Sequence, residues 1–232
     1  MNGGFSNAAT EFDDLPNKQG LAAGDFNRDN NLDIAIVTLN GKPPNNSHVT
    51  ILLGDGTGGF RTGAEFGVNN LPSSVAAGDL NKDGILDLVV AGALPENTTG
   101  TFISTYLGDG TGKFGLKNTI ALGQGSLKGE IALGDFNEDG ILDVAYPQTS
   151  VRTNHGTKVL IFFGDATGSL LAGPILAVGR QPHTVVSADF NKDGHLDLAV
   201  SNSTDGTISI LLGDGTGNFT MSSTTSVVSP IP

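Results

Sequence analysis

The segment GDFNEDGILD at residues 134–143 decides the architecture, because closely similar segments stand at three other places in the chain. They read GDFNRDNNLD at 24–33, GDLNKDGILD at 78–87 and ADFNKDGHLD at 188–197. Their first aspartates, Asp25, Asp79, Asp135 and Asp189, are 54, 56 and 54 residues apart. Self-similarity at a fixed period indicates a repeat architecture, in which one supersecondary unit is used several times.

A second, glycine-rich phrase recurs between these acidic segments. It reads GDGTGGF at 54–60, GDGTGKF at 108–114, GDATGSL at 164–170 and GDGTGNF at 213–219. Phosphate-binding loops need Gly-Lys-Ser/Thr leading into a helix, and this phrase has neither. Asp-Gly between apolar runs is typical of hairpin turns, so we predict a turn and no binding role.

Each unit is predicted to hold four short strands and no helix. Apolar runs of five to eight residues are bounded by Gly, Asn, Asp and Pro, and no 3.6-residue period persists. The run before each acidic segment has small residues, as in VAAGD at 75–79, whereas the run after it is bulky, as in LDLVV at 86–90. Small side chains suit strands around a central axis. We therefore predict an all-β fold, a β-propeller of four-stranded antiparallel blades, with an extended stack of hairpins as the alternative.

The repeats fill one domain over residues 1–232. Repeats are expected near 20–69, 74–123, 130–179 and 184–228, with residues 1–14 as an extra outer strand. The first residues match the tail of a glycine-rich phrase, so the chain resembles a segment of a longer array. Two arrangements stay open: four blades that close on themselves, or a homodimer whose terminal strands pair to complete eight blades.

The acidic segment has the spacing of a calcium loop, Asp-x-Asn-x-Asp-Gly-x-x-Asp. Ca²⁺ takes six to eight oxygens, and side chains at positions 1, 3 and 5 converge only if the chain curls tightly. Glycine at position 6 permits the curl, position 7 offers its carbonyl, and position 9 adds a carboxylate. We expect about four Ca²⁺ sites, with candidate ligands Asp25, Asn27, Asp29, Asn31, Asp33, Asp79, Asn81, Asp83, Ile85, Asp87, Asp135, Asn137, Asp139, Ile141, Asp143, Asp189, Asn191, Asp193, His195 and Asp197.

A plain turn is the alternative, because Asp and Asn often form turns. Four copies with three aspartates each would carry a large like-charge repulsion without a cation, which favours the metal site. Asn30 replaces the glycine in the first copy. Asparagine tolerates the left-handed conformation better than other non-glycine residues, so we expect the first site to be the weakest.

The amino-acid composition limits the classes of partner that this chain can bind. The net charge is −12, with 24 acidic and 12 basic residues, which argues against nucleic acid and anionic membranes. The chain has no cysteine, so disulfides, thiolate metal sites and cysteine nucleophiles are excluded. No apolar run reaches the roughly 20 residues of a membrane span, and the first residues do not form a signal peptide.

The two phrases together resemble FG-GAP repeats of the VCBS kind, a family that includes the integrin α-subunit head. The resemblance covers nearly the whole chain and is most specific at the acidic segment. It implies a propeller with calcium in the loop between the first and second strands of each blade. It also implies an extracellular or cell-surface place, with adhesion, ligand recognition or scaffolding as the role. Relatives commonly have seven or eight blades, and only four acidic segments occur here.

The residues leave three functions open. The first is a calcium-binding adhesion or scaffold module with an unknown protein or glycan ligand, and it leads to the expectation that the chain is not an enzyme. The second is a lectin, which the absence of Trp and the strand-like settings of Tyr106 and Tyr146 disfavour. The third is a propeller enzyme such as a polysaccharide lyase. Only Arg180 and His183 suggest a site of that kind, at the entry to an inner strand.

Overall fold

Sixteen strands make up the described part of the computed structural model, which covers residues 18–38, 47–68, 71–94, 100–123, 129–149 and 157–227. The proposed extra strand at 1–14 lies outside these residues. Blade 1 consists of β1 (Lys18–Gly24), β2 (Asp33–Thr38), β3 (His48–Gly54) and β4 (Phe60–Gly67), and blade 2 of β5 (Leu71–Gly78), β6 (Asp87–Ala93), β7 (Thr101–Gly108) and β8 (Phe114–Ala121). Blade 3 consists of β9 (Ala132–Gly134), β10 (Asp143–Gln148), β11 (Lys158–Gly164) and β12 (Leu170–Ala177), and blade 4 of β13 (Pro182–Ala188), β14 (Asp197–Asn202), β15 (Thr207–Gly213) and β16 (Phe219–Ser226).

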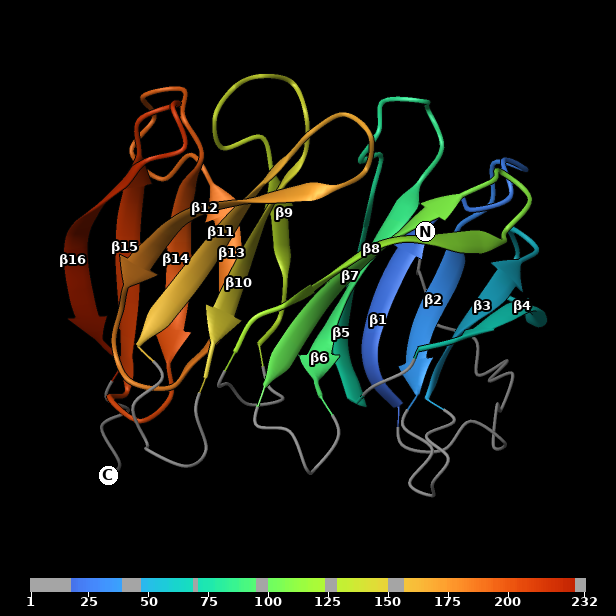
Figure 1. Cartoon of the computed structure of the whole chain (residues 1–232), viewed down its shortest axis with the longest axis horizontal. Coiled ribbons are helices and arrows are strands. Elements are labelled where there is room, and N and C mark those ends of the chain that lie inside the picture. Colours follow the sequence, from blue (N-terminus) through green and yellow to red (C-terminus); the bar gives the residue numbers. More distant parts are fainter. Residues whose placement is uncertain are drawn as a thin grey trace, which may run out of the picture.

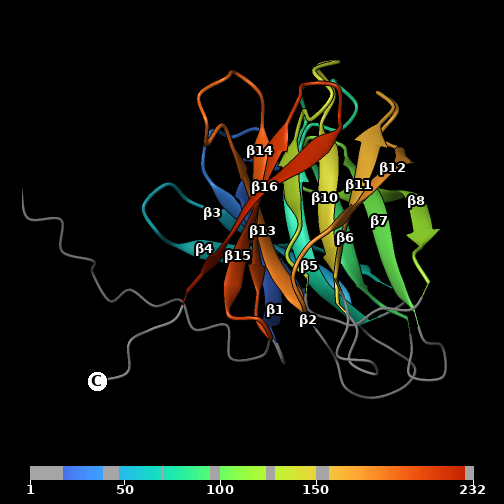
Figure 2. The same cartoon turned by 90° about the vertical axis from the view of Figure 1, so that its left-hand side faces the viewer.

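Every blade is a four-stranded antiparallel sheet whose strands follow the order of the sequence. This confirms the predicted all-β fold and the number of blades. The small-residue strands β1, β5, β9 and β13 lie innermost, where successive blades meet, and the polar strands β4, β8, β12 and β16 lie outermost (Figures 1 and 2). Outer strands face water along most of their length, as their polar composition dictates. No helix in the described residues is long and apolar enough to cross a membrane.

Hydrophobic cores lie between adjacent blades, because each sheet is apolar on both faces. Phe26 and Ile51 of blade 1 pack with Leu88 and Phe102 of blade 2. Equivalent cores join blade 2 to blade 3 and blade 3 to blade 4. Each interior sheet is therefore held from two sides, and the blades follow one another in an arc from blade 1 to blade 4 (Figure 1).

Both tyrosines belong to these cores. Tyr106 packs in the core between blades 1 and 2, where its ring contacts Phe66. Tyr146 is fully buried between blades 2 and 3. Both tyrosines lie in strands, as their sequence settings indicated, and neither ring offers an exposed platform for a sugar.

Candidate metal centre

The four acidic loops lie at the same end of the array. Each loop joins the first strand of a blade to the second, and each closes on a paired residue such as Gly24 opposite Asp33. The glycine-rich turns join the third strand to the fourth, so antiparallel order brings them to that end as well (Figure 1). One face of the molecule therefore collects both recurring phrases.

Side-chain oxygens at positions 1 and 3 converge within each loop. In the first loop, Oδ1 of Asp25 and Oδ1 of Asn27 both accept the backbone N–H of Asp29, at 3.1 and 2.9 Å. The other Asp25 oxygen accepts the N–H of Asn30 at 2.8 Å. The same bonds recur in the other three loops. Four copies therefore curl in the same way, as the spacing predicted.

The aspartate at position 5 completes the exposed half of the loop. In the first loop, Oδ1 of Asp29 accepts the N–H of Asn31 at 2.8 Å, and its Oδ2 accepts the side-chain amide of Asn27 at 2.9 Å. These bonds lower the pKa of Asp29, the backbone bond from Asn31 contributing most. The carboxylate of Asp29 is thus ionised at neutral pH and open to water over the loop.

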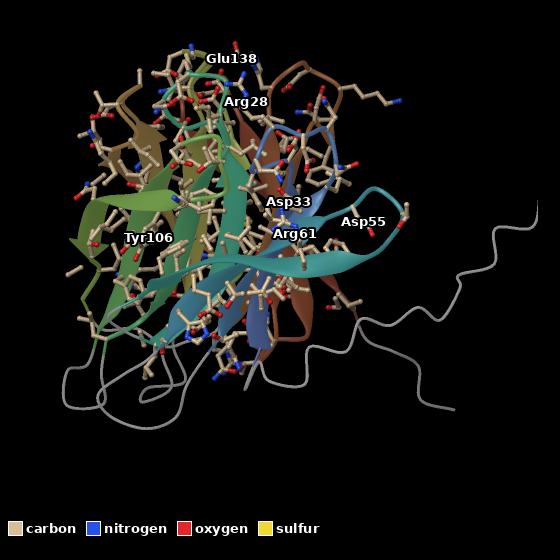
Figure 3. The ribbon with its side chains drawn as sticks, turned by 90° about the vertical axis from the view of Figure 1, so that its right-hand side faces the viewer. Arg28, Asp33, Asp55, Arg61, Tyr106 and Glu138 are labelled. Carbon is tan, nitrogen blue, oxygen red and sulfur yellow. The ribbon has the colours of Figure 1, made fainter. Side chains whose placement is uncertain are left out.

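The aspartate at position 9 has a different environment. Asp33, Asp87, Asp143 and Asp197 are fully buried. In blade 1, Asp33 Oδ2 accepts the N–H of Phe26 and Oδ1 accepts the N–H of Gly54, both at 2.9 Å. The same two bonds recur in the other blades. Figure 3 shows Asp33 among the strands and Asp55 out on the glycine-rich turn. Position 9 therefore ties the acidic loop to the end of the third strand, a role that the spacing alone did not predict.

Burial changes the acidity of this residue. Desolvation raises the pKa of Asp87, against the lowering effect of its two backbone N–H bonds. It raises the pKa of Asp143 to about 6, with further upward contributions from the negative charges of Asp139 and Asp135. The loop therefore concentrates negative charge around a buried carboxyl group, and a cation would relieve that strain.

Two residues in each loop have a left-handed backbone. Position 6 does so as predicted: Asn30 has φ 67°, and glycines stand at the equivalent places in the other loops. Position 4 does so as well, and there the residues are Arg28, Lys82, Glu138 and Lys192. This second left-handed position could not be predicted from the sequence, because none of these four residues is a glycine or an asparagine.

No direct ion pair neutralises the twelve loop aspartates within the described residues. Nor do three Asp, Glu or His side chains in that part of the chain group closely enough to hold an ion by themselves. A metal in these loops therefore requires the amide oxygen at position 3 and a backbone carbonyl, which is the mixed donor set that the spacing predicted.

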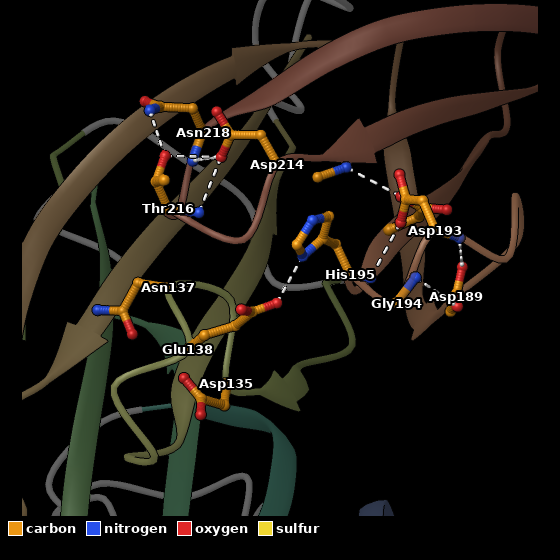
Figure 4. A network of polar contacts seen from close by, with 12 residues as sticks. Asp135, Asn137, Glu138, Asp189, Asp193, Gly194, His195, Asp214, Thr216 and Asn218 are labelled. Atoms are coloured by element: carbon orange, nitrogen blue, oxygen red, sulfur yellow. Dashed lines mark hydrogen bonds and ion pairs between the residues drawn. The ribbon is translucent and has the colours of Figure 1, made fainter.

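The glycine-rich phrase forms the predicted turn. Asp55 Oδ1 accepts the N–H and the hydroxyl of Thr57, both at 2.8 Å, and the N–H of Gly59 at 3.0 Å. Figure 4 shows the equivalent turn of blade 4, in which Asp214 holds Thr216 and Asn218. The aspartate thus forms its hydrogen bonds within its own turn, in agreement with the predicted role as a turn residue.

The glycine-rich turn also forms a hydrogen bond to the preceding blade, and this contact was not predicted. The N–H of Gly112 in blade 2 donates to the carbonyl of Phe26 in blade 1, at 2.9 Å. The N–H of Gly217 in blade 4 donates to the carbonyl of Phe136 in blade 3, at the same distance. A hydrogen bond between Glu138 and His195 also joins the acidic loops of blades 3 and 4 (Figure 4). The two recurring phrases therefore dock against each other across blade boundaries.

Arg180 and His183, the pair considered for a catalytic role, have separate partners. The backbone N–H and the guanidinium of Arg180 both donate to Asp205 in the turn between β14 and β15. A ring nitrogen of His183 lies 3.2 Å from the hydroxyl of Thr184. No hydrogen bond or ion pair joins Arg180 directly to His183 among the described residues.

Comparison with known families agrees with the repeat geometry. A model of the FG-GAP-like repeat matches residues 25–90 and 189–231. These two segments carry FG-GAP-like repeats. The matched segments contain the first, second and fourth acidic loops, and the third loop has the same hydrogen bonds. No curated protein sequence matches the chain significantly.

Solved structures with the same arrangement as these FG-GAP-like repeats are distant in sequence. A protein from Lactobacillus plantarum is 16% identical, with a TM-score of 0.62 over 93% of this chain. The chain spans 57% of the length of that protein. A GH43_1 enzyme from Xanthomonas citri is 14% identical, with a TM-score of 0.55 over 90% of this chain and 74% of the enzyme. These likenesses show the propeller fold.

The prediction that the chain is not an enzyme is corrected by the second match. It rested on the absence of a recognisable catalytic cluster in the sequence. An enzyme has the same fold over most of this chain, so propellers of this shape do carry catalysis. Fold and function are separate matters, and the match assigns no reaction to the FG-GAP-like repeats.

Proposed function

We propose that the acidic loops bind Ca²⁺, about one ion per loop, and that the bound ions stabilise a propeller that recognises a ligand outside the cell. The observation that supports this is the recurrence, in four loops, of converging oxygens at positions 1 and 3 beside aspartates that have no direct ion pair among the described residues. A cation offsets such a charge more effectively than hydrogen bonds within the loop.

The donors in each loop suit a hard cation. Positions 1 and 5 offer carboxylates, position 3 an amide oxygen and position 7 a backbone carbonyl. The carboxylate at position 9 uses one lone pair on each oxygen for a backbone N–H, and each oxygen retains a second. The same aspartate can therefore hold the blade and contribute to the ion, which supplies positive charge at the centre of the loop.

The position of the loops supports the proposed recognition role. The acidic loops and the glycine-rich turns cover one face, and hydrogen bonds from one blade to the next hold them in place. Loops on a rigid scaffold are the usual carriers of binding function. Extracellular calcium is abundant enough to fill sites with dissociation constants of 10⁻⁴–10⁻³ M, which is the order reached by calcium modules outside the cell.

Calorimetry tests the metal assignment. Chelator-treated protein titrated with CaCl₂ should bind about four ions per chain, and MgCl₂ should bind far more weakly because Mg²⁺ demands a tighter octahedral shell. The absence of calcium heat would contradict the proposal. A glycan array and a panel of matrix proteins, each probed in calcium and in EDTA, then test recognition. Ligand binding that is the same in both buffers would show that the loops do not shape the recognition surface.

A further inference from the structure

Each blade uses the same residues to contact its neighbours. The residue at position 2 of the acidic loop packs under the next blade, and Phe26 and Phe136 are accordingly 1% and 2% exposed. The residue at position 8 packs against the blade before: Leu86, Leu142 and Leu196 are partly buried in the three cores. A blade therefore has a forward face, toward the next blade, and a backward face, toward the previous one.

The forward face of blade 4 is open. Phe190, at position 2, is 47% exposed, and Val186 on the inner strand is 51% exposed, whereas its equivalent Ala132 is buried. Ile210 on β15 is half-buried, although its equivalent Ile51 in blade 1 is completely buried. The apolar side chains that form a core elsewhere thus face water at this end.

The backward face of blade 1 is exposed to water near its inner strand β1 and near its acidic loop. Leu21 is 65% exposed, whereas its equivalent Val185 is 2% exposed. Leu32, at position 8, is 68% exposed. The middle of this face, at Ile36 and Leu52, is already buried, so the contact that remains available is the one nearest the inner strand and the acidic loop.

We propose that the forward face of blade 4 binds the backward face of blade 1 in a second copy of this chain. Within the chain, the forward face of one blade packs against the backward face of the next three times. The exposed faces of blade 4 and blade 1 are the same two kinds of surface. Val186 and Phe190 are placed to cover Leu21 and Leu32 of the other copy, as Ala22 and Phe26 cover Val75 and Leu86. Two such contacts, related by a two-fold axis, join two copies into a ring.

Backbone groups at the two faces are complementary too. In two internal interfaces a turn glycine donates its N–H to the carbonyl at position 2 of the previous blade. Gly58 is the equivalent donor in blade 1, and the space beside it is open. Phe190 is the equivalent acceptor in blade 4. Among the described residues neither group makes this bond, so each is available to the other copy.

Charge favours the same partner. The side chain at position 4 reaches toward the next blade: Lys82 extends to Gly140 in the third loop, and Glu138 bonds His195 in the fourth. Lys192 holds this position in blade 4. In the paired arrangement its ammonium group would face the first acidic loop of the second copy, where Asp29 and Asp25 are exposed or partly exposed.

One residue of blade 4, Ala188, prevents the contact between copies from matching the internal contacts in full. Gly24, Gly78 and Gly134 leave room for the leucine of the next blade, and a Cβ there would meet its Cδ1 atom. Blade 4 has Ala188 in this place. Leu32 of the second copy must therefore shift its side chain, which weakens the contact relative to the internal ones. The change Ala188→Gly should tighten association.

Light scattering in saturating calcium tests the proposal. The chain should have a mass of about 47 kDa, twice the 23.7 kDa of one copy, and should dissociate on dilution. Val186→Asp and Leu21→Asp should each weaken association by at least about a hundredfold, because each buries an unpaired carboxylate. Leu116→Asp is the matched control, since Leu116 is equally exposed but lies on an outer strand of blade 2.

Mixing the two variants tests complementarity. A Leu21→Asp chain keeps a sound forward face and a Val186→Asp chain a sound backward face, so a 1:1 mixture should form pairs that neither forms alone. A monomeric wild type, an effect of Leu116→Asp equal to the others, or a failure of the mixture to pair would overturn the proposal. Circular dichroism of each variant shows that the blades are folded. These results do not depend on the proposed ligand recognition.

Discussion

The fifth and ninth positions of the acidic loop both hold aspartate, yet the two residues differ in exposure and in structural role. Asp29, at position 5, is exposed, and its hydrogen bonds lower its pKa. Asp143, at position 9, is buried between backbone N–H groups, and desolvation raises its pKa to about 6. One loop therefore combines an open half, whose carboxylate is free to face an ion, with a closed half that holds two strands together.

The largest expected effect comes from calcium itself. Each of four sites filled at a hundred times its dissociation constant adds about 2.7 kcal/mol, so together they add about 11 kcal/mol, comparable to the stability of a whole domain. Thermal melts in millimolar calcium and in chelator should therefore differ widely. Equal melting temperatures would mean that the open half of the loop binds nothing and that both halves are structural.

Removing the buried aspartate should be the next most harmful change. Asp87→Ala leaves the N–H groups of Leu80 and Gly108 without an acceptor in a buried place, at a cost of about 3–5 kcal/mol. Because this loss concerns backbone bonds, it should appear in chelator as well as in calcium. Urea unfolding measures it, with Asp87→Asn as a milder variant should the alanine protein fail to fold. An effect confined to calcium would assign position 9 to the ion alone.

The exposed aspartate of the same loop provides the contrast. Asp83→Asn should leave stability in chelator nearly unchanged, since its bonds lie within the exposed loop. In calcium it should remove one bound ion in four, and the gap between the two melting temperatures should shrink by a comparable share. Calorimetry counts the ions. A large loss of stability in chelator would erase the distinction between the two halves.

The smallest expected effect concerns backbone conformation at the first loop. Asn30 has φ 67°, a region that glycine occupies without strain. Asn30→Gly should raise stability by about 0.5–1 kcal/mol and strengthen calcium binding at the first loop. Asn31→Gly is the control, because Asn31 is outside the left-handed region and its replacement should be neutral or harmful. Similar responses from both would show that the turn does not limit the site.

Local features of this protein were predictable from its sequence. Strand order, blade number and the turn formed by Asp55 with Thr57 follow from contacts between residues close in the chain. The curl of the acidic loop follows from spacing in the same way, down to the left-handed conformation of Asn30. Because such features recur in every repeat, comparing the four copies within the sequence was enough to predict them.

Features that join distant residues were missed. Asp33 accepts a bond from Gly54 and Phe26 accepts one from Gly112, and nothing in either motif shows that it has a partner so far along the chain. The left-handed conformation of Lys82 was missed for another reason, since lysine has no special preference for it and its surroundings impose it. The recurrence of Gly-Asp-Gly-Thr-Gly in step with the acidic loop was the one available signal of their contact.

The arrangement in which adjacent blades share their hydrophobic cores has a kinetic consequence. Stability in such an array is close to a sum of terms for single units and for adjacent pairs, so opening starts at a free end and spreads inward. In a single copy, the last blade shares a core with blade 3 alone among the described residues, so it should exchange its amide hydrogens sooner than the two middle blades, and pairing with a second copy should reduce this difference. Since each sheet is completed within about fifty residues of sequence, the strands of a blade can pair as it leaves the ribosome, and each core forms once the next blade has followed.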